Sequence, residues 1–198
     1  KSKIKESQPT AIATGVLAGV FGLGLILVPS SIQTVEAGSV AVVKHLGEAK
    51  TIRKAGTYFD FWVTEEYLYY DATVQNLSIS ASAYSKDAQT MQIAMTVQYQ
   101  IQEDAAIKIA NEYGALETLE NRIQSVAIEK AKARLSSYSA MQIIETRASI
   151  SPQVEEDIMT AIGDSYYVGV NTVVLTDIAF SDAFEKIVED KMIAEQEK

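Results

Sequence analysis

Hydrophobic residues follow three different patterns along the chain, beginning with a continuous apolar run near the N-terminus. Residues 11–28 carry no charge, and their only polar side chain is the hydroxyl of Thr14. The uncharged stretch is longer still and extends over residues 7–35. As a helix, residues 11–28 would cover ~27 Å, close to the ~30 Å thickness of bilayer hydrocarbon. The pattern therefore predicts a transmembrane helix over residues 10–30, preceded by a tail of residues 1–9.

Small residues recur within this run at four-residue spacing. Gly15 and Gly19 share one face of the predicted helix, and Gly22 follows Ala18 at the same spacing. Such faces let membrane helices approach each other closely. Glycine is also simply frequent in membrane helices, so both interpretations stay open. We name Gly15, Gly19 and Gly22 as candidate helix-packing residues.

The charges around the run predict an orientation. Lys1, Lys3 and Lys5 precede it, and only Lys44 follows it closely. The positive-inside rule then places the N-terminus in the cytoplasm and the main domain on the opposite side of a membrane crossed once. The alternative is a signal peptide cleaved near Ala37, which would release a secreted or periplasmic binding module. The apolar run is longer than the usual signal sequence, which favours a lasting anchor.

The middle of the chain alternates apolar and polar residues, as strands with one solvated face do. The alternation is strongest in residues 76–84 and 91–102, which the short linker 85–88 joins into a predicted antiparallel hairpin. Weaker strand patterns cover residues 35–43, 67–71 and 166–180. We expect residues 30–34 and 44–55 to be connecting segments, the second of them charged.

The last of these strands is expected to place five apolar residues on one face. They are Val168, Val170, Val174, Ile178 and Phe180.

An aromatic cluster occupies residues 57–63, T-Y-F-D-F-W-V. One interpretation is that about half of these side chains fill the core. The other is that they form a loop whose aromatics enter the lipid interface, where such side chains are enriched. We name Phe59, Phe61 and Trp62 as candidate membrane-interface residues.

In the C-terminal part the apolar spacing changes to three and four residues, which predicts helices. They cover residues 104–113, residues 117–136 and a segment that begins at Ser151-Pro152 and ends at Gly163. The whole pattern is that of an α+β protein.

A last helix, residues 181–198, has a narrow apolar stripe of Phe184, Val188 and Met192 within dense mixed charge. This pattern favours contact with a partner helix, as in a coiled coil, and we name these three residues as candidate oligomer contacts. The chain begins with Lys1 and ends within this pattern, so we expect it to be a segment of a longer protein with a truncated C-terminal helix.

Composition excludes several classes of function. The net charge of −9 offers no basic stripe for nucleic acid, and cysteine is absent. The single histidine, His45, has no partner pattern and is expected to be a solvated polar residue rather than a catalytic base. Carboxylate pairs are sequence neighbours and so do not face each other. We therefore predict no catalytic, cofactor-binding or metal-binding residues, and a protein that is not an enzyme.

Four stretches in order resemble the SPFH or Band 7 (prohibitin/stomatin-like) family. They are V-E-A-G-S-V-A-V-V at 35–43, K-A-G-T-Y-F at 54–59, residues 85–101 beginning S-K-D-A-Q-T, and residues 177–197 beginning D-I-A-F-S-D. One departure is visible, because the family often has proline where Asp60-Phe61 stands.

The resemblance implies an SPFH domain over residues 35–180, with an antiparallel sheet and packed helices, followed by a long helix. It implies many copies of the chain, or of the chain and a paralogous subunit, assembled into a ring or cage on membrane lipid. Such an assembly would act as a scaffold that organises a membrane microdomain, and it would often contact a membrane-bound AAA protease. It implies neither catalysis nor a cofactor.

Overall fold

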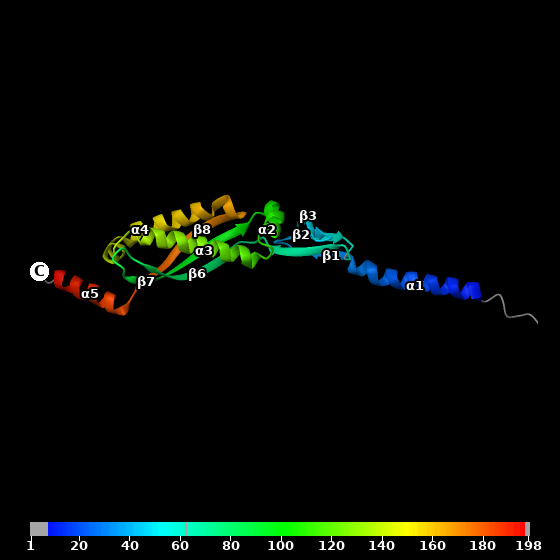
Figure 1. Ribbon diagram of the computed structural model, residues 1–198, viewed down its shortest axis with the longest axis horizontal. Helices are drawn as coiled ribbons and strands as arrows, with labels where there is room; N and C mark the ends of the chain where they lie inside the picture. Colours follow the sequence, from blue (N-terminus) through cyan, green and yellow to red (C-terminus); the bar gives the residue numbers. More distant parts are fainter. Residues whose placement is uncertain (1–7, 62, 197–198) are drawn as a thin grey trace, which may run out of the picture. The chain divides into compact units, whose positions relative to one another are not determined.

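The computed structural model describes residues 8–61 and 63–196, and for residues 8–12, 26–30 and 164 it describes the backbone alone. The chain divides into two compact units, one that ends at Tyr69 and one that begins at Tyr70. Figure 1 shows their helices and strands.

The first element is helix α1, Gln8–Ser30, which confirms the prediction of a helix here. Its described side chains, those of residues 13–25, are exposed or half-exposed within this chain. Among the residues whose side chains the structure describes, no helix is both long enough and apolar enough to cross a membrane. The transmembrane character of α1 therefore stays a prediction from the sequence.

The rest of this unit consists of short strands in two small sheets. Strand β1, Ile32–Val35, pairs antiparallel with β4, Gly56–Phe59. Strand β2, Ser39–His45, lies between β3, Glu48–Arg53, and β5, Glu65–Asp71.

Two predictions for this unit were wrong. Residues 30–34 were expected to connect elements but contain β1, and residues 44–55 were expected to be a loop but contain the end of β2 and all of β3. Both missed strands lie at a sheet edge. Strand β1 is only four residues long and exposes Ile32 while Gln33 is half-buried, so its apolar residues do not mark its inner face. Strand β3 has no fully buried side chain and no regular alternation.

The second unit is built on a sheet of three long antiparallel strands in the order β6-β7-β8. Strand β6 is Gln75–Tyr84, β7 is Thr90–Ile101 and β8 is Val168–Phe180. The predicted hairpin is confirmed. The register of β8 against β7 shifts at two bulges, so Val173 and Leu175 are buried and Val174 is 43% exposed. The prediction that Val174 shares the face of Ile178 was therefore wrong, because each bulge adds a residue that pattern counting misses.

The helices of this unit begin with the 3-10 turn η1, Glu103–Ala105, and α2, Ala106–Glu112, as expected for residues 104–113. Helix α3, Leu116–Leu135, packs against β6, and α4, Ala140–Ile162, packs against β8 and against α3 (Figure 1). The turn η2, Gly163–Tyr166, leads into β8, and α5, Asp182–Gln196, follows it.

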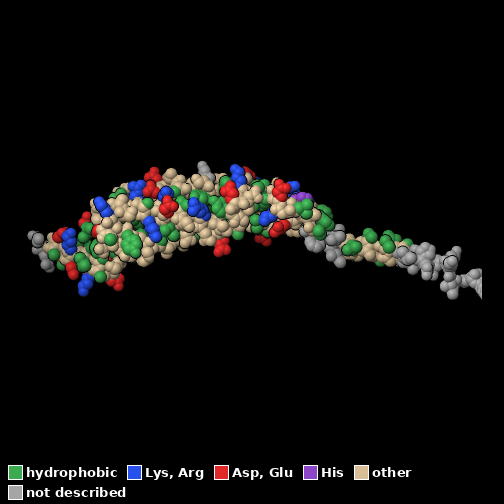
Figure 2. All heavy atoms as spheres, in the orientation of Figure 1, with side chains coloured by type: hydrophobic (Ala, Val, Ile, Leu, Met, Phe, Trp, Pro, Cys, Tyr) green, Lys and Arg blue, Asp and Glu red, His purple; other side chains and the backbone are tan. Residues whose placement is uncertain are grey.

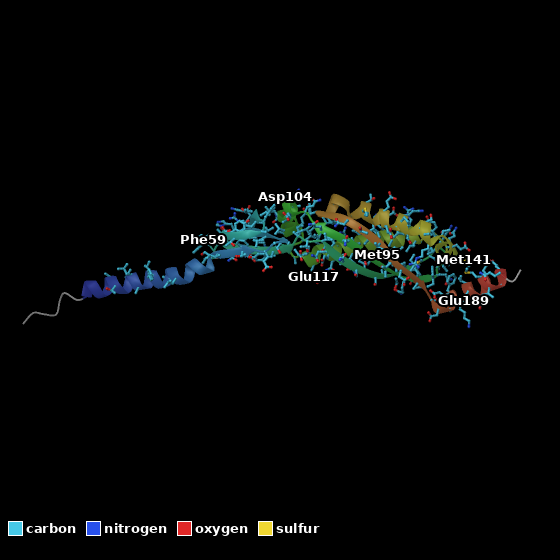
Figure 3. The ribbon with its side chains drawn as sticks, turned by 180° about the vertical axis from the view of Figure 1, so that it is seen from behind. Phe59, Met95, Asp104, Glu117, Met141 and Glu189 are labelled. Atoms are coloured by element: carbon cyan, nitrogen blue, oxygen red, sulfur yellow. The ribbon has the colours of Figure 1, made fainter. Side chains whose placement is uncertain are left out.

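The core lies between the two long helices and the sheet. Ile79, Met95 and Ile158 come from β6, β7 and α4, and each is only 1% exposed. Met95 lies in the middle of this unit (Figure 3). The apolar side chains that recur every second residue in the strands and every three or four residues in the helices thus pack into one apolar layer.

The start of α4 differs from the prediction, which placed it at Ser151. The helix starts after Ser139, whose side chain accepts a hydrogen bond from the Gln142 amide, while the Gln142 side chain accepts one from the Ser139 amide. This capping box satisfies two backbone donors at the true N-terminus. Pro152 lies inside the helix, where proline does not mark a start.

Candidate membrane-facing site

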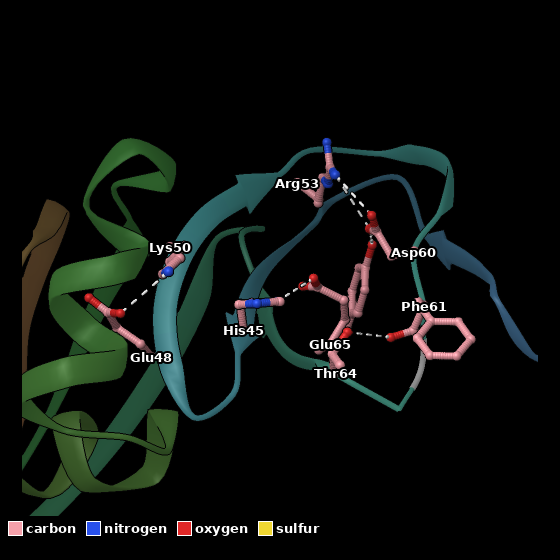
Figure 4. Close-up of polar contacts among 9 residues, drawn as sticks. His45, Glu48, Lys50, Arg53, Asp60, Phe61, Thr64 and Glu65 are labelled. Atoms are coloured by element: carbon pink, nitrogen blue, oxygen red, sulfur yellow. Dashed lines mark hydrogen bonds and ion pairs between the residues drawn. The ribbon is translucent and has the colours of Figure 1, made fainter.

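A polar network holds the loop that follows β4. The guanidinium of Arg53 donates from Nη2 to both carboxylate oxygens of Asp60, at 3.1 and 3.4 Å, and the hydroxyl of Tyr67 also donates to Asp60 (Figure 4). The Asp60 side chain is only 15% exposed. We call these three residues the Asp60 clamp, and they join the end of β3, the loop after β4 and strand β5.

The clamp is a partly desolvated ionic site. Burial raises the pKa of the Tyr67 phenol above its ordinary value, and the hydrogen bond to Asp60 and its negative charge act in the same direction. The Arg53 guanidinium also lies over the ring of Tyr58, 4.7 Å from its centroid. Within the described part of the chain, Arg53 Nε is buried and has no hydrogen-bond partner. Two side chains, those of Arg53 and Tyr67, therefore hold the Asp60 carboxylate.

The two described aromatic candidates flank this clamped residue and point outward. Phe59 is 68% exposed and Phe61 is 47% exposed, whereas Tyr58 is half-buried. Figure 3 shows Phe59 at the surface of this unit. Trp62, the third candidate, lies outside the described residues.

Three further exposed apolar side chains belong to the same unit and were missed in the sequence. Ile32 is 53% exposed and pairs with Phe59 across β1 and β4, Leu46 is 76% exposed, and Val63 is 57% exposed. We call Ile32, Leu46, Phe59, Phe61 and Val63 the apolar rim. Figure 2 shows hydrophobic side chains gathered beside His45 at this part of the surface. A leucine followed by glycine between charged residues was the available signal for Leu46.

His45 lies at the end of β2, beside this rim, rather than in a loop. Its Nδ1 is 2.7 Å from Glu65 Oε1, and both side chains are partly exposed (Figure 4). A histidine paired with a carboxylate across strands stabilises their register.

The candidate glycines of α1 lie on open helix surface. Apart from the helix's own nearby backbone, an added Cβ at Gly15, Gly19 or Gly22 would meet no described atom within 4 Å. Nothing in the described chain occupies the smooth faces that their spacing creates.

The structure separates the three candidate oligomer contacts of α5. Val188 is 6% exposed, and the Phe184 ring packs on Phe180 at 5.3 Å between centroids, so both contact their own chain. Met192 is 53% exposed, and the sequence stripe omitted two other exposed side chains, Ile187 at 64% and Ile193 at 49%. A partner helix would therefore find Met192, Ile187 and Ile193 rather than the full predicted stripe.

An open groove of about 680 Å³ lies between α3, α4 and η2. It is lined by residues of both charges together with a small apolar floor: Arg122, Val126, Glu129, Lys130, Glu156, Asp157, Thr160, Ala161 and Tyr166. Among the described residues no group of three histidine or carboxylate side chains could hold a metal ion.

Comparison with known proteins places these features in a family. The family model described as "SPFH domain / Band 7 family" matches residues 33–198. The chain is 28% identical over 186 residues to Prohibitin 1 of Gallus gallus, covering 90% of this chain and 67% of that protein. It is 26% identical over 196 residues to Prohibitin-7, mitochondrial, of Arabidopsis thaliana, covering 96% of this chain and 68% of that protein.

A third relative is Prohibitin-1 of Colletotrichum higginsianum, 25% identical over 177 residues, which are 88% of this chain. The match spans 64% of that relative, a little under two thirds of its length. Because the family model covers both the small sheets around the Asp60 clamp and the large sheet with its helices, this chain belongs to the SPFH domain / Band 7 family.

Proposed function

We propose that the chain is a subunit of a membrane-anchored scaffold, held in the bilayer by residues 10–30 and assembled in many copies into a ring or cage. The observation that carries the proposal is the apolar rim, which begins two residues after α1 ends. Five large apolar side chains, 47–76% exposed in one small unit, are unusual for a surface that faces only water. An uncharged stretch of residues 7–35 runs up to this rim.

The scaffold would act without catalysis, by multiplying contacts between subunits. Its partners would be membrane lipid, further copies of the chain or a paralogous subunit, and a membrane-bound AAA protease. Met192, Ile187 and Ile193 on α5 would supply contacts to a neighbouring helix, and the glycine faces of α1 would supply contacts within the bilayer. In this proposal residues 35–180 form the subunit's main domain and residues 181–198 begin a longer helix.

The orientation we propose follows the lysines at the N-terminus, with residues 1–9 in the cytoplasm and the main domain on the opposite side. The name of the Arabidopsis relative places that protein in mitochondria. Protease protection of tagged termini in sealed vesicles tests this orientation.

Release by cleavage near Ala37 is the competing candidate. Ala37 lies in the turn between β1 and β2, so cleavage there would remove β1 together with the buried side chain of Val35. Strand β4 would lose its hydrogen-bonding partner. This cost favours an uncleaved chain. Mass spectrometry of the mature N-terminus separates the two, since a start at Gly38 would contradict the anchor.

The decisive experiment is the mass of the full-length protein extracted from membranes in mild detergent. We expect particles many times heavier than the 21.6 kDa of this chain, with a ring or cage outline in electron microscopy. A monodisperse monomer would contradict the scaffold. Alkaline washing of the membranes tests the anchor separately, because an anchored protein stays with the lipid.

A further inference from the structure

Leu46 occupies a backbone conformation that is unfavourable for leucine. It has φ of +52° and is followed by Gly47 at +88°, in the two-residue connection of β2 and β3. Hairpin turns of this type favour Asn-Gly, because a side chain with Cβ is strained in the left-handed region and asparagine tolerates it best. The Leu46 side chain is 76% exposed, so burial within the described chain does not offset the strain.

The turn is attached to the loop that carries other members of the apolar rim. The Leu46 amide donates to the Thr64 carbonyl at 3.0 Å, and the Thr64 amide donates to the Phe61 carbonyl at 3.0 Å. Leu46 is therefore held beside the segment that contains Phe61 and Val63.

The Asp60 clamp determines the direction of the two phenylalanines. In an extended chain neighbouring side chains point to opposite sides. Because Arg53 and Tyr67 hold the Asp60 carboxylate inward, Phe59 and Phe61 point outward. An ionic network that is itself partly buried thus presents two apolar rings to the exterior.

Two observations favour a lipid surface as the partner of the apolar rim. The Asp60 amide donates to the Ser31 carbonyl at 2.8 Å, so the clamped loop is bonded to the residue that directly follows α1. The polar groups beside the apolar rim are also paired with each other, which lowers the cost of bringing them near hydrocarbon. Arg53 forms an ion pair with Asp60, and His45 lies within hydrogen-bonding distance of Glu65.

We infer that Leu46 is a lipid-contacting residue and that the Asp60 clamp is a positioning device which holds Phe59 and Phe61 toward the same bilayer surface. The inference rests on the proposed membrane anchor and adds to it a defined contact outside the helix. Strain at Leu46 is then offset when its side chain leaves water for lipid.

The absence of cysteine allows a direct test in the full-length protein. A nitroxide is attached to Leu46→Cys, or to the control Ala37→Cys, whose parent residue is also exposed but lies beyond the opposite end of β1. In phosphatidylcholine vesicles we expect oxygen to relax the label at position 46 more than a water-soluble nickel chelate does, and the reverse at position 37. A label at 46 that reports water overturns the inference. A label shielded from both reagents also overturns it, because a protein copy would then cover Leu46.

A second variant, Leu46→Asn, is expected to raise the stability of the fold while weakening the contact with lipid. Leu46→Asn relieves the left-handed strain, so we expect the melting temperature in detergent to rise by a few degrees. The same variant should reduce the oxygen preference of a label at Val63→Cys in vesicles. If the melting temperature and the oxygen preference of the label both decrease, Leu46 contributes only to the fold and the inference fails.

The clamp is tested by Tyr67→Phe, which removes one hydrogen bond to Asp60, with Tyr69→Phe on the same strand as the control. We expect a label at Phe61→Cys to become more mobile in the first variant only, and equal mobility would overturn the positioning role.

Protein that alkaline washing removes from vesicles would overturn the anchor and this inference together. Protein that is retained while its label at 46 reports water would overturn this inference alone.

Discussion

At the scale of single residues, Arg134 and Asp157 join the two long helices. Arg134 donates to Asp157 from Nε at 2.6 Å and from Nη2 at 2.8 Å, the two-bond geometry that guanidinium and carboxylate favour. These hydrogen bonds lower the pKa of Asp157, and the positive charges of Arg134 and Lys130 act in the same direction. The pair thus ties α3 to α4 where both are partly open to water.

This pKa shift predicts a dependence of stability on pH. A carboxylate whose pKa is lower in the folded state stabilises the fold above its unfolded pKa of ~3.9, and the contribution is lost as pH falls through the folded pKa. We therefore expect Asp157→Asn to lower the urea midpoint at pH 7 and to flatten the decline below about pH 4. Urea titrations from pH 2 to 7 measure both effects.

The neighbouring exposed carboxylate supplies the control. Glu156→Gln should leave the pH dependence close to that of the parent, because no described residue pairs with Glu156. An equal effect of the two substitutions would show that overall charge, rather than the Arg134 pair, produces the decline.

At the scale of elements, α4 contains two departures from regular helix geometry. Thr146 has φ of −118° and ψ of 24°, and its hydroxyl donates to the Gln142 carbonyl at 2.6 Å. Pro152 follows within the same helix and has no amide hydrogen to donate to the carbonyl of Ala148. The helix is therefore kinked at Thr146 and lacks one backbone hydrogen bond at Pro152.

Replacing this proline should stabilise the unit. Pro152→Ala restores a backbone hydrogen bond worth, with relief of ring clashes, ~3 kcal/mol, offset by ~1 kcal/mol of added freedom in the unfolded chain. We expect the free energy of unfolding to rise by about 2 kcal/mol in chemical denaturation. Glu156→Ala, also exposed on α4, should change it by less than about 0.5 kcal/mol. No gain in Pro152→Ala would mean that the helix already accommodates the ring without strain.

Helix α1 allows a clean test of contacts between chains. Because no described atom beyond the helix's own nearby backbone lies within 4 Å of a Cβ at Gly15 or Gly19, we expect the chain itself to tolerate leucine there. We expect Gly15→Leu or Gly19→Leu to leave membrane insertion intact but to loosen the assembly, seen as a smaller particle mass in detergent. Val20→Leu adds bulk beside this face and should leave the mass unchanged. An unchanged particle mass in all three variants would show that α1 serves only as an anchor and makes no contact between chains.

At the scale of the whole molecule, the two compact units have separate cores. The unit that begins at Tyr70 contains the large sheet, both long helices and buried residues from each of them. We expect residues 70–198 produced alone to unfold in one cooperative transition with native near-ultraviolet circular dichroism. A fragment that lacks this signal would show that the unit needs the N-terminal strands to fold.

The sequence by itself determined the elements with strong local patterns and the family. The alternation of residues 91–102 predicted β7, the spacing of residues 117–136 predicted α3, and the order of four stretches identified the SPFH domain / Band 7 family. These features are local or collinear, so they are readable without knowing which segments meet. Phe59 and Phe61 were also identified as candidates from their clustering alone.

The tertiary structure decided what depends on partners distant in sequence. Strands β1 and β3 exist because other strands supply their hydrogen bonds, and Val174 faces outward because bulges shift its register. Leu46 joins the apolar rim through a bond to Thr64, and Val188 turns inward although its stripe suggested a partner. Pairing, register and the side of an element that is already covered are non-local properties, which a residue's neighbours in sequence do not encode.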